Sequence, residues 1–445
     1  MNGLYEHYKQ RLPYLDLPKT ITDAFQVTKE MGLRYIWIDS LCIIQDNNED
    51  KQTEMAIIMQ IYQNAQFTIS AASASSVEQG FLRLNLHDSR TVIFHHPLRV
   101  DERTMGSILI SHETLSNFAD ACARPQPINT RGWTLQEMLF TPRVLIFTNM
   151  HMVWRCQTGY MPNAVTTSDS SRASRDRPNQ WETWSIICGY DFISLKSLEA
   201  TATRRILGIG EVFLRKDDLY STWQMVLRRY ADRLLTIPSD RLLAISAVAR
   251  AFASYFKAPY YAGLWGNYIE QGLMWYSSAP DVKISGPPSW SWATANAVSY
   301  PYLGDVSVKA EVISCKTTLL SDKNPFGEVT GGELVIPGQL KPVWLNLEDD
   351  EILDHDADTT FFWSDGKLEK WEASLSSLNH IAILCLVLGE TPTALSSTTH
   401  TTCRMMALVE CQERKDCYRR IGLVEAKSAP PYWWEDWDRV TVTIV

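Results

Sequence analysis

The chain has 445 residues, of which 45% are hydrophobic and 21% charged, so it is a globular protein long enough for two to four domains. Its 42 basic and 51 acidic residues give a net charge of −9 without a concentrated basic face, which argues against a nucleic-acid partner. The longest apolar run, Ile381–Leu388, is far shorter than a membrane span, and the N-terminus lacks the apolar core of a signal peptide. Nine cysteines without a CxxC pair indicate reduced thiols, so we expect a cytoplasmic protein without a membrane partner.

The first 80 residues show helical and extended patterns in alternation. Apolar residues recur at helical spacing over residues 17–32, where Pro18 stands near the start and Gly32 lies just past the end. The strand Tyr35–Asp39, a second helical pattern that includes Tyr62, and the strand Phe67–Ala74 follow. This order predicts an α/β fold with βαβ units on a parallel sheet. The functional crevice of such a sheet lies at the carboxyl ends of its strands, where we expect Asp39.

The rest of the chain changes character twice. Further strands are predicted at Thr91–Val100 and within Arg143–Cys156, with a turn and a short helix between them. Beyond residue 181 helical periodicity dominates, and from Val306 the apolar residues alternate with period two, which is typical of an antiparallel β module. We therefore expect an α/β domain over residues 1–165, a linker at 166–180, a helical region over 181–300 and a β-rich module over 301–445.

One candidate site lies in the segment WIDSLCIIQD. Asp39 could orient a polar group of a ligand, Cys42 could act as a nucleophile, and Gln45 follows within reach. The alternative for Asp39 is a helix or loop cap, and the alternative for Cys42 is a small buried apolar residue.

A second candidate site lies in the segment RGWTLQE. Trp133 and Glu137 are four residues apart and so share one face of the predicted short helix, and Arg131 and Gln136 lie beside them. The alternative is an Arg131–Glu137 ion pair that ties the helix to the sheet, with Trp133 in the core.

Two tryptophans form a third candidate. In the segment PPSWSW, Trp290 and Trp292 share one face if the chain is extended, and they could form a stacking wall for a ligand or pack in the core. No motif for a nucleotide, a phosphate or a catalytic serine occurs, and the calcium-like run Asp354–Thr360 lacks the glycine and the final glutamate of such a loop. We expect no metal and no cofactor.

Six segments resemble, in order, the fungal heterokaryon-incompatibility (HET) domain and the region that usually follows it. They are spread over most of the chain: Leu17–Phe25, Leu33–Ala74, Arg131–Phe147, Ser239–Ala249, Tyr260–Trp265 and Pro287–Ala293. The resemblance implies a cytosolic protein of a filamentous fungus and kinship to allorecognition proteins whose HET domain triggers cell death. It also implies a TIR/flavodoxin-like parallel sheet, since the HET domain is thought to resemble the Toll/interleukin-receptor (TIR) fold.

The resemblance also implies a role for Glu137. Some TIR proteins hydrolyse NAD with a glutamate that follows a tryptophan by four residues, as Glu137 follows Trp133 in this chain. Such a carboxylate would stabilise the oxocarbenium-like state as nicotinamide leaves. A family strand motif that reads approximately ALSYxWG is missing, because only 16 residues precede Leu17. We therefore expect an N-terminally truncated domain without one wall of the family's nucleotide site. Either the sequence itself is cut short, or the protein has abandoned the ancestral activity and covered its sheet in another way.

Three functional hypotheses follow. The favoured hypothesis is a HET scaffold repurposed as a cofactor-independent enzyme, which cyclises an apolar intermediate of fungal natural-product biosynthesis in a Trp-rich pocket. Its catalytic residues would be Glu137, Asp39, Arg131 and Gln136, and its apolar small-molecule substrate would contact Trp133, Cys42, Gln45, Trp290 and Trp292. The alternative is a regulator of incompatibility and cell death that hydrolyses NAD through Glu137. The third hypothesis is a non-catalytic interaction protein.

Overall fold

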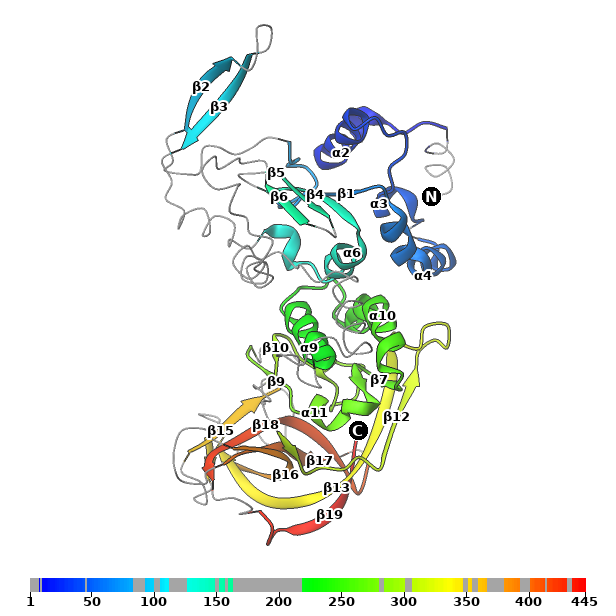
Figure 1. Cartoon of the computed structure of the whole chain (residues 1–445). Coiled ribbons are helices and arrows are strands. Elements are labelled where there is room, and N and C mark those ends of the chain that lie inside the picture. The colour runs from blue at the N-terminus through cyan, green and yellow to red at the C-terminus, as the bar shows by residue number, and fades with distance from the viewer. Residues whose placement is uncertain are drawn as a thin grey trace. The chain divides into compact units, whose positions relative to one another are not determined.

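The chain divides into two compact units, Met1–Leu198 and Glu199–Val445, which are described separately. The computed structural model (Figure 1) describes residues 8, 10–44, 46–82, 93–99, 105–111, 126–148, 152–156, 159–162, 218–279, 284–300, 306–346, 351–353, 359–365, 380–392, 401–412, 414–429 and 434–445. No helix in these ranges is long and apolar enough to cross a membrane.

Helices and strands of the first unit follow the predicted order except at residues 35–39, where no strand forms. The α-helices are α2 (Lys19–Glu30), α3 (Asp39–Cys42), α4 (Asn48–Asn64) and α6 (Thr134–Phe140), with 3-10 turns η1 (Tyr14–Asp16) and η2 (Pro127–Thr130). The strands are β1 (Thr68–Ser70), β2 (Ile93–Arg99), β3 (Met105–Ser111), β4 (Arg143–Phe147), β5 (Met152–Cys156) and β6 (Gly159–Pro162). Pro18 precedes α2 and Gly32 follows it with φ +71°, as the spacing predicted.

The sheet of the first unit contains less parallel pairing than expected. Its order is β1-β4-β5-β6, and only β1 and β4 run parallel, with Thr68 opposite Val144. β4, β5 and β6 form an antiparallel meander, and β2 and β3 form a separate hairpin. The described residues of the first unit therefore show an α/β arrangement with a single parallel pair, instead of the parallel sheet that the sequence predicted.

The predicted strand Tyr35–Asp39 is not part of this sheet. Its residues Tyr35–Ile38 lie outside any strand, and Asp39 begins helix α3. The prediction rested on a run of apolar residues, in which Ile36 and Ile38 pack on the core, Trp37 is partly buried and Tyr35 is 82% exposed. A short apolar run records burial and not the presence of a neighbouring strand, and the strand prediction was wrong for that reason.

A buried carboxylate ties α2 to the loop that follows β1. Asp23 is almost fully buried, forms an ion pair with Lys19, and accepts hydrogen bonds from the backbone N–H groups of Phe81 (2.8 Å) and Leu82 (3.2 Å). Gly80 precedes these amides with φ +72°, and a Cβ atom there would lie 2.5 Å from the Asp23 carboxylate. The loop therefore requires glycine at this position.

The second unit combines short helices with one large sheet. Its helices are α9 (Asp218–Ala231), α10 (Ser246–Phe256) and α11 (Ile269–Gly272), with 3-10 turns η3 (Pro238–Arg241), η4 (Leu243–Ile245), η5 (Gly266–Tyr268) and η6 (Trp292–Thr294). Short strands form two small hairpins, β7 (Tyr260–Tyr261) with β8 (Leu264–Trp265) and β9 (Tyr276–Ser277) with β10 (Val298–Ser299). The core of this region is aromatic and contains the fully buried Trp223, Trp265, Trp275, Trp290 and Trp292.

The nine-stranded sheet contains the antiparallel module that the period-two pattern predicted. Its strands are β11 (Ser307–Val308), β12 (Ser314–Leu319), β13 (Val329–Asn346), β14 (Glu351–Leu353), β15 (Thr359–Ser364), β16 (His380–Pro392), β17 (Thr401–Glu410), β18 (Cys417–Ala429) and β19 (Asp438–Ile444). β13, β16, β17, β18 and β19 pair in a closed ring, in which only β18 and β19 run parallel. This curled sheet is drawn from yellow to red in Figure 1.

A buried ion pair joins the sheet to the helical part of the second unit. Arg420 on β18 is fully buried, and its Nε donates to Asp365 Oδ2 at 2.8 Å. Its terminal nitrogens donate to the carbonyl oxygens of Leu273 and Trp275, both at 2.5 Å. The guanidinium lies 3.7 Å from the centre of the Trp275 ring. The predicted regions 181–300 and 301–445 therefore share one core.

Candidate functional site

Helix α3 presents the first candidate segment at the surface. Asp39 is exposed and is the first residue of α3, and its Oδ1 accepts a hydrogen bond from the backbone N–H of Ser40 at 2.7 Å. Cys42 ends the same turn and is exposed, so the alternative of a buried apolar thiol does not hold. Gln45 lies outside the described residues. The sequence analysis expected Asp39 at the carboxyl end of a strand, whereas the structure places it at the start of a helix.

The polar run after α3 fixes the start of α4. Asn47 Oδ1 accepts a hydrogen bond from the backbone N–H of Asp50 at 3.2 Å, which is the geometry of a helix N-cap. The carboxylate of Asp50 in turn accepts from the N–H of Ile44 at 2.8 Å. These bonds connect α3 to α4 and so fix where α4 begins.

Tyr62 lies near the C-terminal end of α4, which packs against α6. Its ring meets the Trp37 ring edge to face, with 5.9 Å between the centroids and an interplanar angle of 74°. Glu137 on α6 lies close enough to raise the pKa of the Tyr62 hydroxyl. The two helices therefore bring a phenol and a carboxylate together from positions 75 residues apart in the sequence.

Local bonds fix the start and the end of α6. The Thr134 hydroxyl donates to the carbonyl oxygens of Ile128 and Arg131, each at 2.8 Å, which holds the turn that precedes the helix. At the other end, the hydroxyls of Thr141 and Thr68 share a hydrogen bond of 3.0 Å. Helix α6 therefore ends beside the start of β1. Glu137 lies in the middle of this short, anchored helix.

Three of the four predicted catalytic residues carry charges that shift the pKa of Tyr62. Burial raises the pKa of the Tyr62 hydroxyl well above its ordinary value, and the negative charges of Glu137 and Asp39 raise it further. Arg131 is near enough to lower this pKa in opposition. Tyr62 and Glu137 are partly buried, whereas Asp39 and Arg131 are exposed, so the cluster borders solvent. We call these four residues the Glu137 cluster.

The remaining residues of the second segment lie elsewhere on α6. Gln136 is 3% exposed, and its Oε1 is a buried oxygen without a hydrogen-bond partner in the described part of the chain. Trp133 immediately precedes the helix in a helical conformation and is partly buried. Glu137 and Arg131 are therefore the residues of this segment that the structure places in the charged cluster that borders solvent.

The structure places Trp290 and Trp292 in the core rather than on an open wall. Both side chains are fully buried. The Trp292 indole N–H donates to the Gly263 carbonyl oxygen at 2.9 Å, and the Trp290 carbonyl oxygen accepts from the Trp275 indole at 3.1 Å. This is the core-packing alternative, and it leaves neither ring a free face for a ligand.

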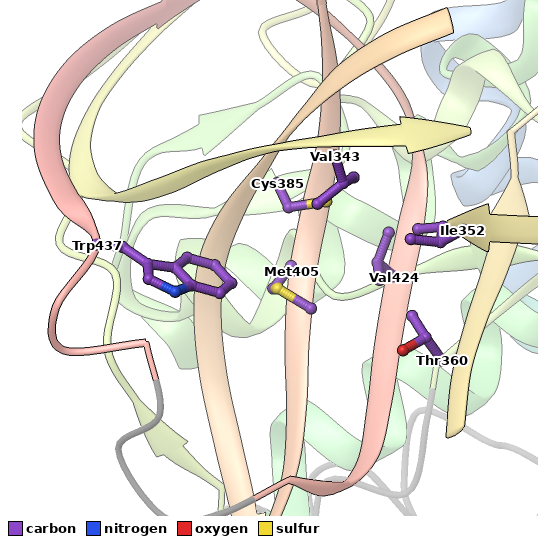
Figure 2. A pocket seen from close by; sticks show the side chains of 7 residues that line it. All are labelled: Val343, Ile352, Thr360, Cys385, Met405, Val424 and Trp437. Atoms are coloured by element: carbon purple, nitrogen blue, oxygen red, sulfur yellow. The ribbon is translucent and has the colours of Figure 1, made fainter. Parts of the chain in front are cut away.

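A small cavity lies within the nine-stranded sheet (Figure 2), lined by Val343, Ile352, Thr360, Cys385, Met405, Val424 and Trp437. Its volume of about 10 Å³ holds roughly one water molecule. A biosynthetic intermediate does not fit in this cavity. The hypothesis of a natural-product cyclase thus receives no support from the buried tryptophans or from this cavity.

Tyr62 is the site residue that the sequence analysis missed. Tyr62 fits the helical spacing of the apolar residues of α4 because its ring is apolar, so the pattern predicts a core residue. The pattern gives no information about the hydroxyl. The signal that was available is chemical: a phenol on an apolar face needs a partner for its O–H group when it is buried.

Comparison with known families identifies the N-terminal part of the chain. Residues 3–137 match the family described as heterokaryon incompatibility protein (HET), and the matched segment ends at Glu137 itself. Neither a search of curated proteins nor a search of solved structures gave a match. The matched segment contains the whole Glu137 cluster, so residues 3–137 are similar to the HET family, as the resemblance of the motifs implied.

Proposed function

We propose that this protein is a heterokaryon-incompatibility type regulator of cell death, and that the Glu137 cluster is its catalytic centre for the hydrolysis of NAD. The observation that supports the proposal is the convergence of Glu137, Asp39, Arg131 and Tyr62 within the segment that matches the HET family. The proposal includes a TIR-like arrangement of the domain, which the parallel pair of β1 and β4 supports.

The proposed reaction consumes one water molecule for each NAD. The bond between the ribose C1′ and the nicotinamide nitrogen breaks, and nicotinamide leaves with the bonding electron pair. Positive charge develops on the ribose ring, where the Glu137 carboxylate stabilises it electrostatically. A water oxygen then bonds to C1′, and its proton is released to solvent. The products are nicotinamide and ADP-ribose, and no redox step occurs.

The other members of the cluster have distinct tasks in this proposal. Arg131 is exposed and positively charged, so it is suited to bind a phosphate oxygen of the dinucleotide. Asp39 is exposed and carries carboxylate oxygens, which are suited to accept a hydrogen bond from a ribose hydroxyl. Both side chains lie on the solvent side of the cluster, where a large polar substrate can approach.

Expression in a filamentous fungus tests this function. Induction of the full chain is expected to lower cellular NAD and then arrest growth, and Glu137→Gln is expected to abolish both effects because it removes the carboxylate charge. The matched control is Glu30→Gln at the exposed C-terminal end of α2, which makes the same chemical change in the same unit. Normal growth with unchanged NAD at full protein level would contradict the proposal, and so would undiminished toxicity of Glu137→Gln.

A further inference from the structure

Two cysteines face each other at the end of the hairpin that joins β17 to β18. Glu410 stands opposite Tyr418 in the register of these strands, so the next pair toward the turn is Cys411 and Cys417. The backbone N–H of Cys411 donates to the carbonyl oxygen of Cys417 at 2.8 Å, as this pairing requires, and both thiols are free. We propose that Cys411 and Cys417 are a site of reversible oxidation, at which a small disulfide of the glutathione type converts the two thiols into a disulfide. The site lies in the second unit and does not depend on the proposed function.

The pairing brings the two residues to a separation that a disulfide can span. Opposite residues of antiparallel strands project to the same face of the sheet, and a hydrogen-bonded pair has about 5.5 Å between its Cα atoms. Disulfides occur at Cα separations of roughly 4.4–6.8 Å. The Cβ atoms of such a pair lie about 4.5–5.5 Å apart, so a small inward shift at the end of the hairpin brings them to the roughly 3.5–4.5 Å that a disulfide needs.

Two other cysteines of the same sheet lack this geometry. Cys385 stands opposite Ala407, and Cys403 stands opposite Glu390 and Ala426. Ala407 and Cys403 are four residues apart on β17, which places Cys403 about 13 Å along the strand from the position of Cys385. That separation is too large for a disulfide. These two cysteines therefore serve as an internal control in the same sheet.

The two thiols of the pair differ in exposure. Cys411 is partly exposed at the start of a turn whose described residues are exposed, whereas Cys417 is only 4% exposed. Arg414 on this turn forms an ion pair of 2.9 Å with Glu333 on β13, which ties the turn to the neighbouring strand. The pKa of the Arg414 guanidinium is raised by the bond to Glu333 and further by the negative charges of Cys417 and Cys411, so a cation lies near both sulfurs. A small oxidant therefore reaches Cys411 first.

The proposed reaction is a thiol–disulfide exchange in two steps. The Cys411 thiolate attacks one sulfur of oxidised glutathione, the S–S bond of the oxidant breaks, and one glutathione leaves as a thiolate. The Cys417 thiolate then attacks the Cys411 sulfur, which forms the protein disulfide and releases the second glutathione. The two protons of the protein thiols pass to the two glutathione thiolates. Two cysteines are thus oxidised while one glutathione disulfide is reduced to two thiols.

Peptide mass spectrometry of the full chain after treatment with oxidised glutathione tests the proposal. The remaining thiols are blocked with N-ethylmaleimide in acidic urea, and the protein is digested with trypsin. Trypsin cleaves after Arg404, Arg414, Lys415 and Arg419, so Cys411 and Cys417 fall in the separate peptides 405–414 and 416–419. We expect these two peptides to remain linked and to separate with dithiothreitol. Peptide 371–404, which contains Cys385 and Cys403, is expected to carry two blocking groups in the same sample.

Single variants test the order of the two steps. In Cys417→Ser the mixed disulfide between glutathione and Cys411 is expected to accumulate, because the second thiol is missing. In Cys411→Ser the buried Cys417 is expected to take up glutathione at least about tenfold more slowly. The main measurement needs only the parent protein, so it stands even if a variant does not fold. The inference would be overturned if the parent yielded peptides 405–414 and 416–419 unlinked, or if Cys411 kept its glutathione while Cys417 stayed reduced.

Discussion

The buried Arg420–Asp365 pair predicts a large loss of stability when only one partner is changed. In Asp365→Asn the side chain keeps its shape but loses its charge, and Arg420 remains fully buried without its counter-ion. The carbonyl oxygens of Leu273 and Trp275 continue to accept its hydrogen bonds, so the guanidinium stays where it is. The cost is therefore that of an uncompensated buried charge.

The size of this effect follows from the burial of both groups. Removal of one partner of a buried pair typically lowers the free energy of unfolding by about 3–5 kcal/mol. With a slope of about 2–3 kcal/mol per molar urea, this corresponds to a fall of about 1.5 M in the urea midpoint. Replacement of both partners, in Arg420→Met with Asp365→Leu, is expected to recover much of the loss because no charge remains buried.

Urea unfolding of the full chain, followed by tryptophan fluorescence, measures these differences. Arg414→Met is the matched control, because it breaks an ion pair of 2.9 Å with Glu333 on the same sheet at an exposed position. It is expected to change the midpoint little, since water solvates both groups. Equal midpoints for Asp365→Asn and Arg414→Met would refute the reasoning, because the burial of the pair would then have no energetic consequence.

Two further predictions concern each unit by itself. Asp23→Ala is expected to lower the free energy of unfolding by about 2–4 kcal/mol, because the two buried amides after Gly80 lose their acceptor; a melting temperature equal to that of the exposed control Asp16→Ala would contradict this. Iodoacetamide at pH 8 is expected to alkylate exposed Cys42 well before Cys315, because burial raises the pKa of the Cys315 thiol to about 12. Because the raised pKa of Cys315 favours the protonated thiol in the folded protein, it contributes fully to the free energy of unfolding below about pH 9. This contribution declines as the pH rises toward 12. Peptide mass spectrometry over a pH series measures the alkylation, and equal rates at pH 8 would argue against this burial.

Local sequence signals predicted the helices of the first unit well. Pro18 and Gly32 bracket α2, and the turn before Thr134 leads into α6 as the sequence indicated. The strand prediction at Tyr35–Ile38 failed because a short apolar run indicates burial and not whether a neighbouring strand is present.

Long-range pairs were beyond the reach of local patterns. Asp39, Arg131 and Glu137 were selected for their chemical types, but their meeting point at Tyr62 depends on how α4 packs against α6. Nothing in the sequence indicates that Arg420 and Asp365 form a pair, since they are 55 residues apart. Asp365 directly follows one strand pattern, and Arg420 lies within another. In both cases, tertiary packing places the partners together, and a single sequence does not record it.

The most direct test of the central claim is nicotinamide release from NAD by the purified full chain, measured by liquid chromatography. We expect equal amounts of nicotinamide and ADP-ribose from the parent protein and from Glu30→Gln, and a rate at least about 100-fold lower from Glu137→Gln. The claim would be contradicted if the folded parent protein released no nicotinamide, or if Glu137→Gln released it as fast as the parent.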